Sequence, residues 1–276
     1  MFQFSYHLFL AEMNLHGILT FSSEIRPAIA GVGAVHITSH FIHNYPLIYA
    51  FNRRIAEAYV VIPSLHQPFK PSGRRMKERE RIKKPLQYTF IDQVLKEIQL
   101  NNLRHVYSYP AYPVRVNTKK FFLSAKGYGY VEKVKRQIKN FFPTETNWIS
   151  LVPPTRHYTL LISPYRLPKR LYIRIGMKRT GLYKVNLYEI HPTNIKIINY
   201  LKWSNIPVNL YDVRLFSYVV EDYIKVLETR SEPESKRGAN SIGYVRARGL
   251  YEITTPVPNV GRVIVPLPKS LLKMRT

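Results

Sequence analysis

The alternation of side chains from Leu171 to Lys178 constrains the fold more than any other stretch of this sequence. Four apolar positions alternate with four polar or small ones, Leu171, Ile173, Ile175 and Met177 against Tyr172, Arg174, Gly176 and Lys178. Because successive side chains of a strand point to opposite faces, the pattern predicts a half-buried strand with a basic face. Tyr and Arg on such a face can stack on bases, and a glycine between them lets a ligand approach closely. The ordinary alternative is a solvated strand face.

The charge of the whole chain favours the first interpretation. The sequence holds 42 Lys and Arg against 17 Asp and Glu, which gives a formal net charge of +25. The expected partner of such a chain is a polyanion. Hydrophobic residues make up 45% of the 276 positions and aromatic residues 13%, far more than a disordered basic tail contains. We therefore expect a folded basic protein with one sizeable core or two modest ones.

Several other classes of protein are disfavoured by the same sequence. Cysteine is absent, so there is no disulfide framework, thiol nucleophile or thiolate zinc site, and a reducing compartment, the cytoplasm, is expected. The apolar N-terminal run has no positively charged start and is interrupted by Glu12 and Asn14, which argues against a signal peptide. No window approaches the roughly 18 apolar residues that a membrane span needs, so no membrane partner is expected.

The hydrophobic periodicity predicts strands at both ends of the chain. Residues 2–10 indicate a first strand whose core side carries the even-numbered side chains, with Phe9 out of phase. Strand patterns also dominate the chain after residue 157. Together with the helices described next, this order predicts an α+β chain.

Three helices are predicted between these strands. The first covers residues 43–59, with Asn44 as its cap and Pro46 in its first turn. Thr89 and Asp92 have the spacing of a capping box and predict that the second helix starts there. Residues 129–142 fit a third, basic helix.

Two segments have the composition of loops or arms. Residues 70–84 contain eight basic and two acidic residues with almost no apolar content, which predicts a mobile arm. Its candidate contacts to RNA or to a partner are Lys70, Arg74, Arg75, Lys77, Arg79 and Arg81. The polar stretch 229–243 predicts a flexible loop.

The candidate catalytic patterns are weaker than the binding pattern. His36, His40 and His43 have spacings of one helical face, but the β-branched residues around them argue against a helix, so no metal site is expected. A metal-independent ribonuclease would need a His or Tyr base near a Lys, and the chain has many of each without singling out one set. We therefore rank binding above catalysis and expect no metal and no cofactor.

The binding signal is distributed over three basic and aromatic clusters. Each cluster alone would be an ordinary solvated face, so the inference depends on their sum. If their strands lie side by side, they can line one groove for a nucleic acid. Their members are Lys119, Lys120, Lys126 and Tyr128 in the first cluster, the 165–185 segment in the second, and Arg246 and Arg248 in the third.

Four motifs in this order resemble the type I-D form of the CRISPR-associated family five, over most of residues 2–226. They are FIHNYPLIYAFN, YSYPAYPVRV followed by FFLSA, LPKRLYIRIGMKR and HPTN. The resemblance implies an RRM-like ferredoxin fold of the RAMP superfamily, a β-rich C-terminal extension and a projecting basic arm or thumb. We accordingly expect an RRM-like domain over residues 1–165, with the arm near 63–104, and a β-rich part over 166–276 that completes or packs on the first sheet.

The resemblance also implies a function in antiviral defence. Members hold the 5′ handle of the crRNA in the Cascade surveillance complex and cap its backbone filament. The implied partners are the family-seven backbone subunit, the large subunit and, near that subunit, target DNA. A separate nuclease usually cuts the guide precursor, so this chain is expected to be non-catalytic; the alternative is a metal-independent endoribonuclease that processes repeat RNA. The positions carried over as RNA contacts are His43, Asn44, Tyr45, Lys169, Arg170, Tyr172, Arg174, Lys178 and Arg179.

Overall fold

The computed structural model describes most of the chain. The described residues are 2–4, 6–21, 24–27, 34–52, 86–124, 145–176, 180–228, 241–268 and 272–274. The predicted basic arm at 70–84, the helix predicted at 129–142 and most of the loop predicted at 229–243 lie outside these ranges. No helix in the described ranges is long and apolar enough to cross a membrane.

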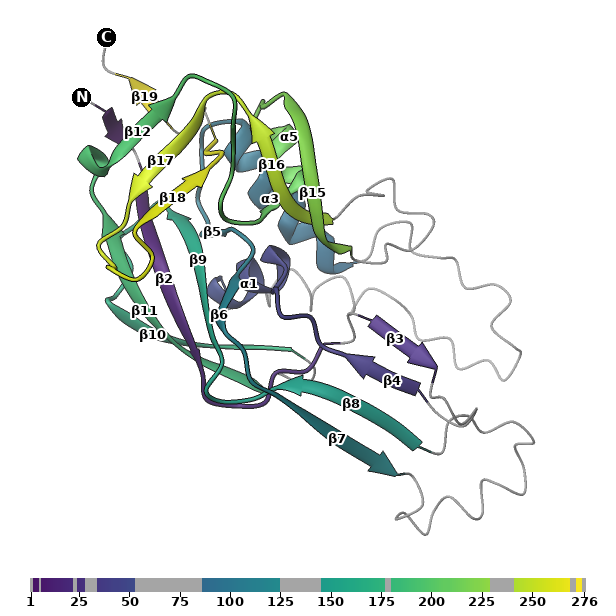
Figure 1. Ribbon diagram of the computed structural model, residues 1–276. Coiled ribbons are helices and arrows are strands. Elements are labelled where there is room, and N and C mark those ends of the chain that lie inside the picture. Colours follow the sequence, from purple (N-terminus) through teal and green to yellow (C-terminus); the bar gives the residue numbers. More distant parts are fainter. Residues whose placement is uncertain are drawn as a thin grey trace, which may run out of the picture.

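The centre of the molecule is a six-stranded antiparallel sheet in the order β10-β11-β2-β9-β5, with β6 also paired to β9 (Figure 1). Its strands are β2 (His7–Leu15), β5 (Tyr107–Ser108), β6 (Tyr112–Arg115), β9 (Arg156–Ser163), β10 (Arg170–Ile175) and β11 (Gly181–Ile190). Strands from before and after residue 165 therefore share one sheet.

Strand β2 is buried on both faces over residues 8–11, because other elements pack on both sides of the sheet there. Leu8 and Leu10 belong to one hydrophobic cluster, and Phe9, Ala11 and Met13 belong to the other. The expectation that Phe9 is out of phase with the core is wrong: its side chain is 2% exposed and packs on the opposite face from Leu8. A separate short strand, β1 (Phe2–Phe4), precedes β2 and pairs with β19 (Leu272–Met274) at the other end of the chain.

The first face of the sheet, on the Phe9 side, is covered by helix α1 (Asn44–Phe51). Leu47 of this helix packs with Ile173 and Val185 of the sheet in one cluster. The cap lies one residue earlier than predicted, because the side chain of His43, not that of Asn44, accepts the backbone N–H of Tyr45. Positions 53–59 of the predicted helix lie outside the described residues.

The second face, on the Leu8 side, is covered over part of its area by the C-terminal half of the chain. Two helices pack there, α3 (Leu86–Gln99) and α5 (Leu210–Leu215), together with two small antiparallel sheets. Thr89 lies inside α3, so the predicted helix start at that residue is wrong. The two small sheets consist of β12 (Ile195–Ile198), β17 (Leu250–Thr254) and β18 (Arg262–Val265), and of β13 (Lys202–Trp203), β14 (Val208–Asn209), β15 (Val220–Glu228) and β16 (Ser241–Ala247). A short 3-10 helix, η3 (Pro192–Asn194), connects β11 to β12.

A further four-stranded sheet projects from the body at the end away from the two termini (Figure 1). Its order is β3-β4-β8-β7, with β4 and β8 parallel and the other pairs antiparallel. The strands are β3 (Glu24–Pro27), β4 (Ala34–Ile37), β7 (Thr118–Ser124) and β8 (Glu145–Leu151). The chain is thus strand-rich with few helices among its described residues, as an α+β class requires.

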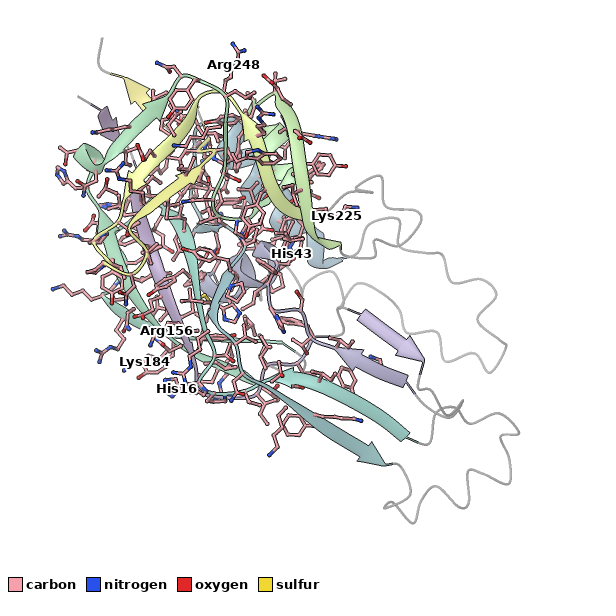
Figure 2. The ribbon with its side chains drawn as sticks, in the orientation of Figure 1. His16, His43, Arg156, Lys184, Lys225 and Arg248 are labelled. Atoms are coloured by element: carbon pink, nitrogen blue, oxygen red, sulfur yellow. The ribbon has the colours of Figure 1, made fainter. Side chains whose placement is uncertain are left out.

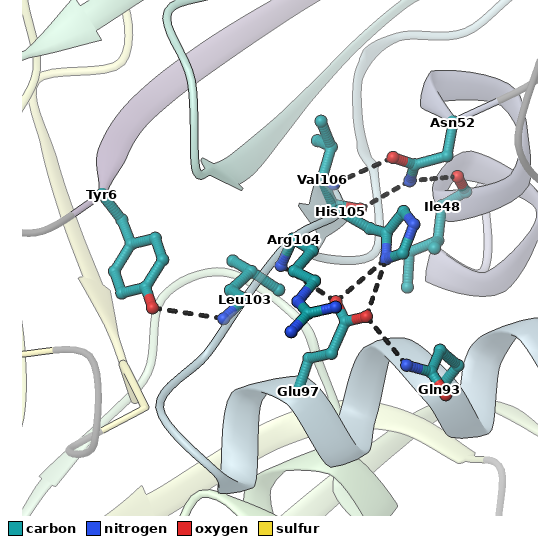
Figure 3. A network of polar contacts seen from close by, with 9 residues as sticks. All are labelled: Tyr6, Ile48, Asn52, Gln93, Glu97, Leu103, Arg104, His105 and Val106. Carbon is teal, nitrogen blue, oxygen red and sulfur yellow. Dashed lines mark hydrogen bonds and ion pairs between the residues drawn. The ribbon is translucent and has the colours of Figure 1, made fainter.

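Buried polar contacts fix α1 and α3 to the segment that leads into β5 (Figure 3). The amide of Asn52 donates to the carbonyl oxygens of Ile48 and Val106, each at 2.8 Å, and its oxygen accepts the Val106 N–H at 2.9 Å. Beside it, Nδ1 of His105 lies 2.9 Å from both carboxylate oxygens of Glu97. Since such buried groups are costly when unpaired, these contacts specify one docking of the two helices.

Candidate nucleic-acid interface

Strand β10 at the edge of the central sheet has the two faces that its sequence predicts. Ile173 and Ile175 are only 5% and 4% exposed, whereas Tyr172 is 62% exposed and Arg174 also faces solvent. The structure gives Gly176 a role other than the predicted close approach of a ligand. It ends the strand with φ of +84°, and a Cβ there would lie 2.8 Å from a methyl group of Leu19, so turn geometry and packing explain this glycine.

The outward face of β10 continues across the sheet as a row of polar and basic side chains. Directly paired positions run in sequence through Tyr172, Lys184, Asn14, Arg156 and Arg115, one from each of five strands. Residues opposite one another share a face, so these side chains form a strip across the sheet. With about 4.8 Å between strands, the strip is roughly 19 Å long.

A second row lies beside the first and contains one carboxylate. Arg170 is paired with Asn186, Asn186 with Glu12, and Glu12 with Tyr158. The Glu12 carboxylate accepts a hydrogen bond from the Asn186 amide at 3.0 Å, and Nη1 of Arg156 lies 3.5 Å from it. Since Arg156 balances this carboxylate, the surrounding cations give the face a net positive charge.

We call this surface the basic sheet face. It has the two components that single-stranded nucleic acids need, which are cations for phosphates and an exposed ring for stacking. Arg156 and Lys184 lie close together with His16 at the lower left of the molecule (Figure 2). The face is defined by Arg115, Arg156, Arg170, Tyr172, Arg174 and Lys184.

Tyr158 and Tyr188 border this face where the sheet passes under the C-terminal half. Their hydroxyl groups donate to the Glu12 carboxylate at 3.4 and 3.3 Å. Burial and the Glu12 charge raise the pKa of both hydroxyl groups, so they remain neutral donors. Glu12 therefore holds the two rings in place at the edge of the open surface.

His43, Asn44 and Tyr45, three of the predicted RNA contacts, are buried rather than exposed. Asn44 is 0% and Tyr45 5% exposed, and His43 is the cap of α1. The Asn44 amide donates to the Asp212 carboxylate of α5 at 2.7 Å, and the Tyr45 hydroxyl donates to it at 3.3 Å. Their positions in this structure give them a packing role, and we leave them out of the basic sheet face.

The described members of the three basic clusters lie on or beside strands of three different sheets. Lys119 and Lys120 lie on β7 of the projecting sheet, the 170–175 strand lies in the central sheet, and Arg246 lies on β16 of a third sheet. Arg248 follows β16 at the opposite end of the molecule from Lys184 (Figure 2). Lys169 and Arg170 lie beside the basic sheet face, and both are exposed. Outside the described residues lie Lys126, Tyr128, Lys178, Arg179 and the arm residues Lys70, Arg74, Arg75, Lys77, Arg79 and Arg81.

The histidines occupy separate structural positions. His36 is on β4, His40 is in a turn and His43 caps α1, and no three His, Asp or Glu side chains gather into a metal site within the described ranges. His157 is fully buried, and its burial lowers its pKa to about 4. The neutral ring donates from Nε2 to the His40 carbonyl oxygen at 2.8 Å and contacts the Tyr183 hydroxyl through Nδ1.

Sequence reasoning did not name half of the basic sheet face as individual contacts, although Lys184 lies inside the 165–185 segment. Arg115, Arg156 and Lys184 come from three strands that are distant in sequence, and only the pairing register brings them to one row. Lys184 could have been found from the sequence, because it alternates with Tyr183 and Val185 in a strand pattern. Arg156 and Arg115 have no such local signal.

The protein-family model described as type I-D CRISPR-associated protein Cas5/Csc1 matches residues 6–229. No curated protein matches the chain significantly.

Proposed function

Because this family model covers most of the chain, the protein belongs to the Cas5/Csc1 family of type I-D CRISPR systems, and we propose that it binds the 5′ handle of the crRNA without cutting it. Family membership supports the role of a subunit of the type I-D Cascade complex. In that complex the chain would cap the backbone filament, next to the family-seven subunit and the large subunit.

The observation that carries this proposal is the basic sheet face. Five cationic side chains share an open sheet face with one exposed tyrosine on the edge strand β10, while the opposite side of β2, β10 and β11 is buried. Splayed bases of single-stranded RNA can stack on Tyr172, and Arg170, Arg174 and Lys184 are placed to meet phosphates. A rigid sheet holds these groups at fixed spacing, which favours an extended strand over a duplex.

The test measures the affinity of the purified chain for single-stranded RNA that carries the repeat-derived 5′ handle. Fluorescence anisotropy gives this affinity at a series of salt concentrations. Arg174→Ala and Lys184→Ala should each weaken binding and reduce the slope of log K against log salt by about 0.7. Tyr172→Ala should cost about 1–3 kcal/mol with little change in slope, because it removes a stacking surface and no charge.

Lys196→Ala is the matched control, because Lys196 is exposed on β12 of a different sheet. If it weakens binding as much as Lys184→Ala does, the chain binds RNA through its general charge and the basic sheet face is not the site. Incubation with uncut repeat RNA in EDTA tests whether the chain is catalytic. Specific cleavage would show an endoribonuclease and contradict the non-catalytic role.

A further inference from the structure

Strand β15 is an exposed edge far from the basic sheet face. Among the described residues it pairs with β16 alone, so its other edge carries no strand. The five consecutive residues 221–225 are all exposed. Since consecutive side chains of a strand point to opposite faces, neither face of this stretch is covered.

The exposed stretch carries large apolar side chains. Val219, just before the strand, is 82% exposed, and Tyr223 and Ile224 are 52% and 55% exposed. Pairing with β16 is regular from Asp222 to Lys225, between two register shifts. Natural proteins usually shorten, charge or cover such edges, because an open regular edge recruits another strand. This edge is charged at Glu221, Asp222 and Lys225, but the exposed pair Tyr223 and Ile224 lies on its regular stretch, which indicates that a partner covers it.

The charge of β15 indicates which class of partner fits. The strand reads VEDYIKVLE, with three acidic residues and one lysine, in a chain whose net charge is +25. Arg248 approaches Glu221 at 3.7 Å, and Arg246 is paired with Asp222, so part of this charge is balanced within the sheet. Exposed pairs of this kind are weak. An acidic strand with apolar side chains repels RNA phosphates and suits a protein segment with apolar and basic side chains.

We infer that β15 is a protein-docking edge, to which an extended segment of another subunit of the type I-D complex adds as a strand. Backbone hydrogen bonds along 222–224 provide the pairing, Tyr223 and Ile224 bury apolar surface, and Glu221 and Asp222 favour a basic segment. The inference relies on the proposed membership of the complex but not on RNA binding by the central sheet.

The test places the photo-crosslinker p-benzoylphenylalanine at three exposed tyrosines in the assembled complex with its guide RNA. Tyr223 is the test position, Tyr172 on the basic sheet face reports RNA, and Tyr200, 63% exposed on another surface, is the matched control. We expect position 223 to crosslink to another protein subunit, with position 200 giving at least about tenfold less of that product. Crosslinking of position 223 to RNA, to a second copy or within the same chain would overturn the inference.

Ile224→Lys provides an independent readout, with Tyr200→Lys as its control. We expect Ile224→Lys to weaken incorporation into the complex at least about tenfold, because it removes a central contact. The melting temperature and the RNA affinity of the isolated chain should stay unchanged. Normal incorporation of the Ile224→Lys chain would overturn the inference. Failure of RNA binding in the Tyr172 experiments would count against the proposed function alone, because these two readouts are independent.

Discussion

Asp212 provides the most discriminating test of how the two halves of the molecule are joined. Its carboxylate is completely buried on α5 and accepts hydrogen bonds from Asn44 and Tyr107 at 2.7 Å and from Tyr45 at 3.3 Å. Burial raises its pKa from 3.8 to about 7, although the three donors oppose that rise. The folded protein therefore binds a proton that the unfolded chain releases at lower pH.

The raised pKa determines the sign and size of a stability change with pH. Between pH 4 and pH 7 the unfolded state binds fewer protons at this site than the folded state, so the free energy of unfolding falls as the pH rises. For a pKa of 3.8 unfolded and about 7 folded, the site removes about 3 kcal/mol of stability between pH 5 and pH 8. Asp212→Asn removes the titration and keeps the size and shape of the side chain.

The assay is urea unfolding of the wild type and of Asp212→Asn at pH 5, 6, 7 and 8. We expect the wild type to lose about 3 kcal/mol relative to the variant over this range. Glu189→Gln is the control, because hydrogen bonding to His7 lowers the pKa of the partly exposed Glu189. Its contribution is fully present above pH 4.5 and is lost only below it, so this variant should parallel the wild type. A wild type that becomes more stable than Asp212→Asn as the pH rises would show that the three donors hold an ionised Asp212 and would refute the argument.

Two further substitutions test the packing around the candidate surfaces. Ile173→Ala should lower the free energy of unfolding by about 2–4 kcal/mol, because the side chain is 5% exposed in the core under β10. The RNA affinity of the folded chain should stay unchanged, and urea unfolding and anisotropy measure the two quantities. A loss of affinity without a loss of stability would mean that β10 faces the other way. Gly243→Ala should cost about 1–3 kcal/mol, since the new Cβ would lie 2.4 Å from the Ile224 carbonyl oxygen across the β15–β16 pair; an unchanged melting curve would contradict this close approach.

The sequence predicted best where a strand has one buried face. On β10 the alternation of Ile173 and Ile175 with Tyr172 and Arg174 is what the structure has, because an edge strand with one open face shows its period directly. On β2 the same rule failed. A central strand covered on both sides has apolar residues at consecutive positions, so Phe9 looked misplaced although it is buried.

The candidate site was only partly predictable, because its members are defined by long-range pairing. The resemblance predicts Asn44 and Tyr45 as RNA contacts, but their partner Asp212 is 168 and 167 positions away. A buried carboxylate with three donors has no local sequence signal. The sequence also could not predict that the basic clusters lie on three sheets. Composition gives the number of cations in a chain and not which strands are neighbours.

The basic sheet face is open because the side chains on this face change from apolar to polar at paired positions of neighbouring strands. On β2 the side chains of this face run from Leu8 and Leu10 to Glu12 and Asn14, and the apolar pair lies under the C-terminal half while the polar pair does not. Ile190 of β11 and Ile162 of β9 are both paired with Leu8, at the apolar end. Lys184 of β11 and Arg156 of β9 are both paired with Asn14, at the polar end. Each strand therefore encodes both a docking surface and an exposed surface on one face. The C-terminal half can cover only the apolar end, since burying the cations at the other end would cost more than packing returns.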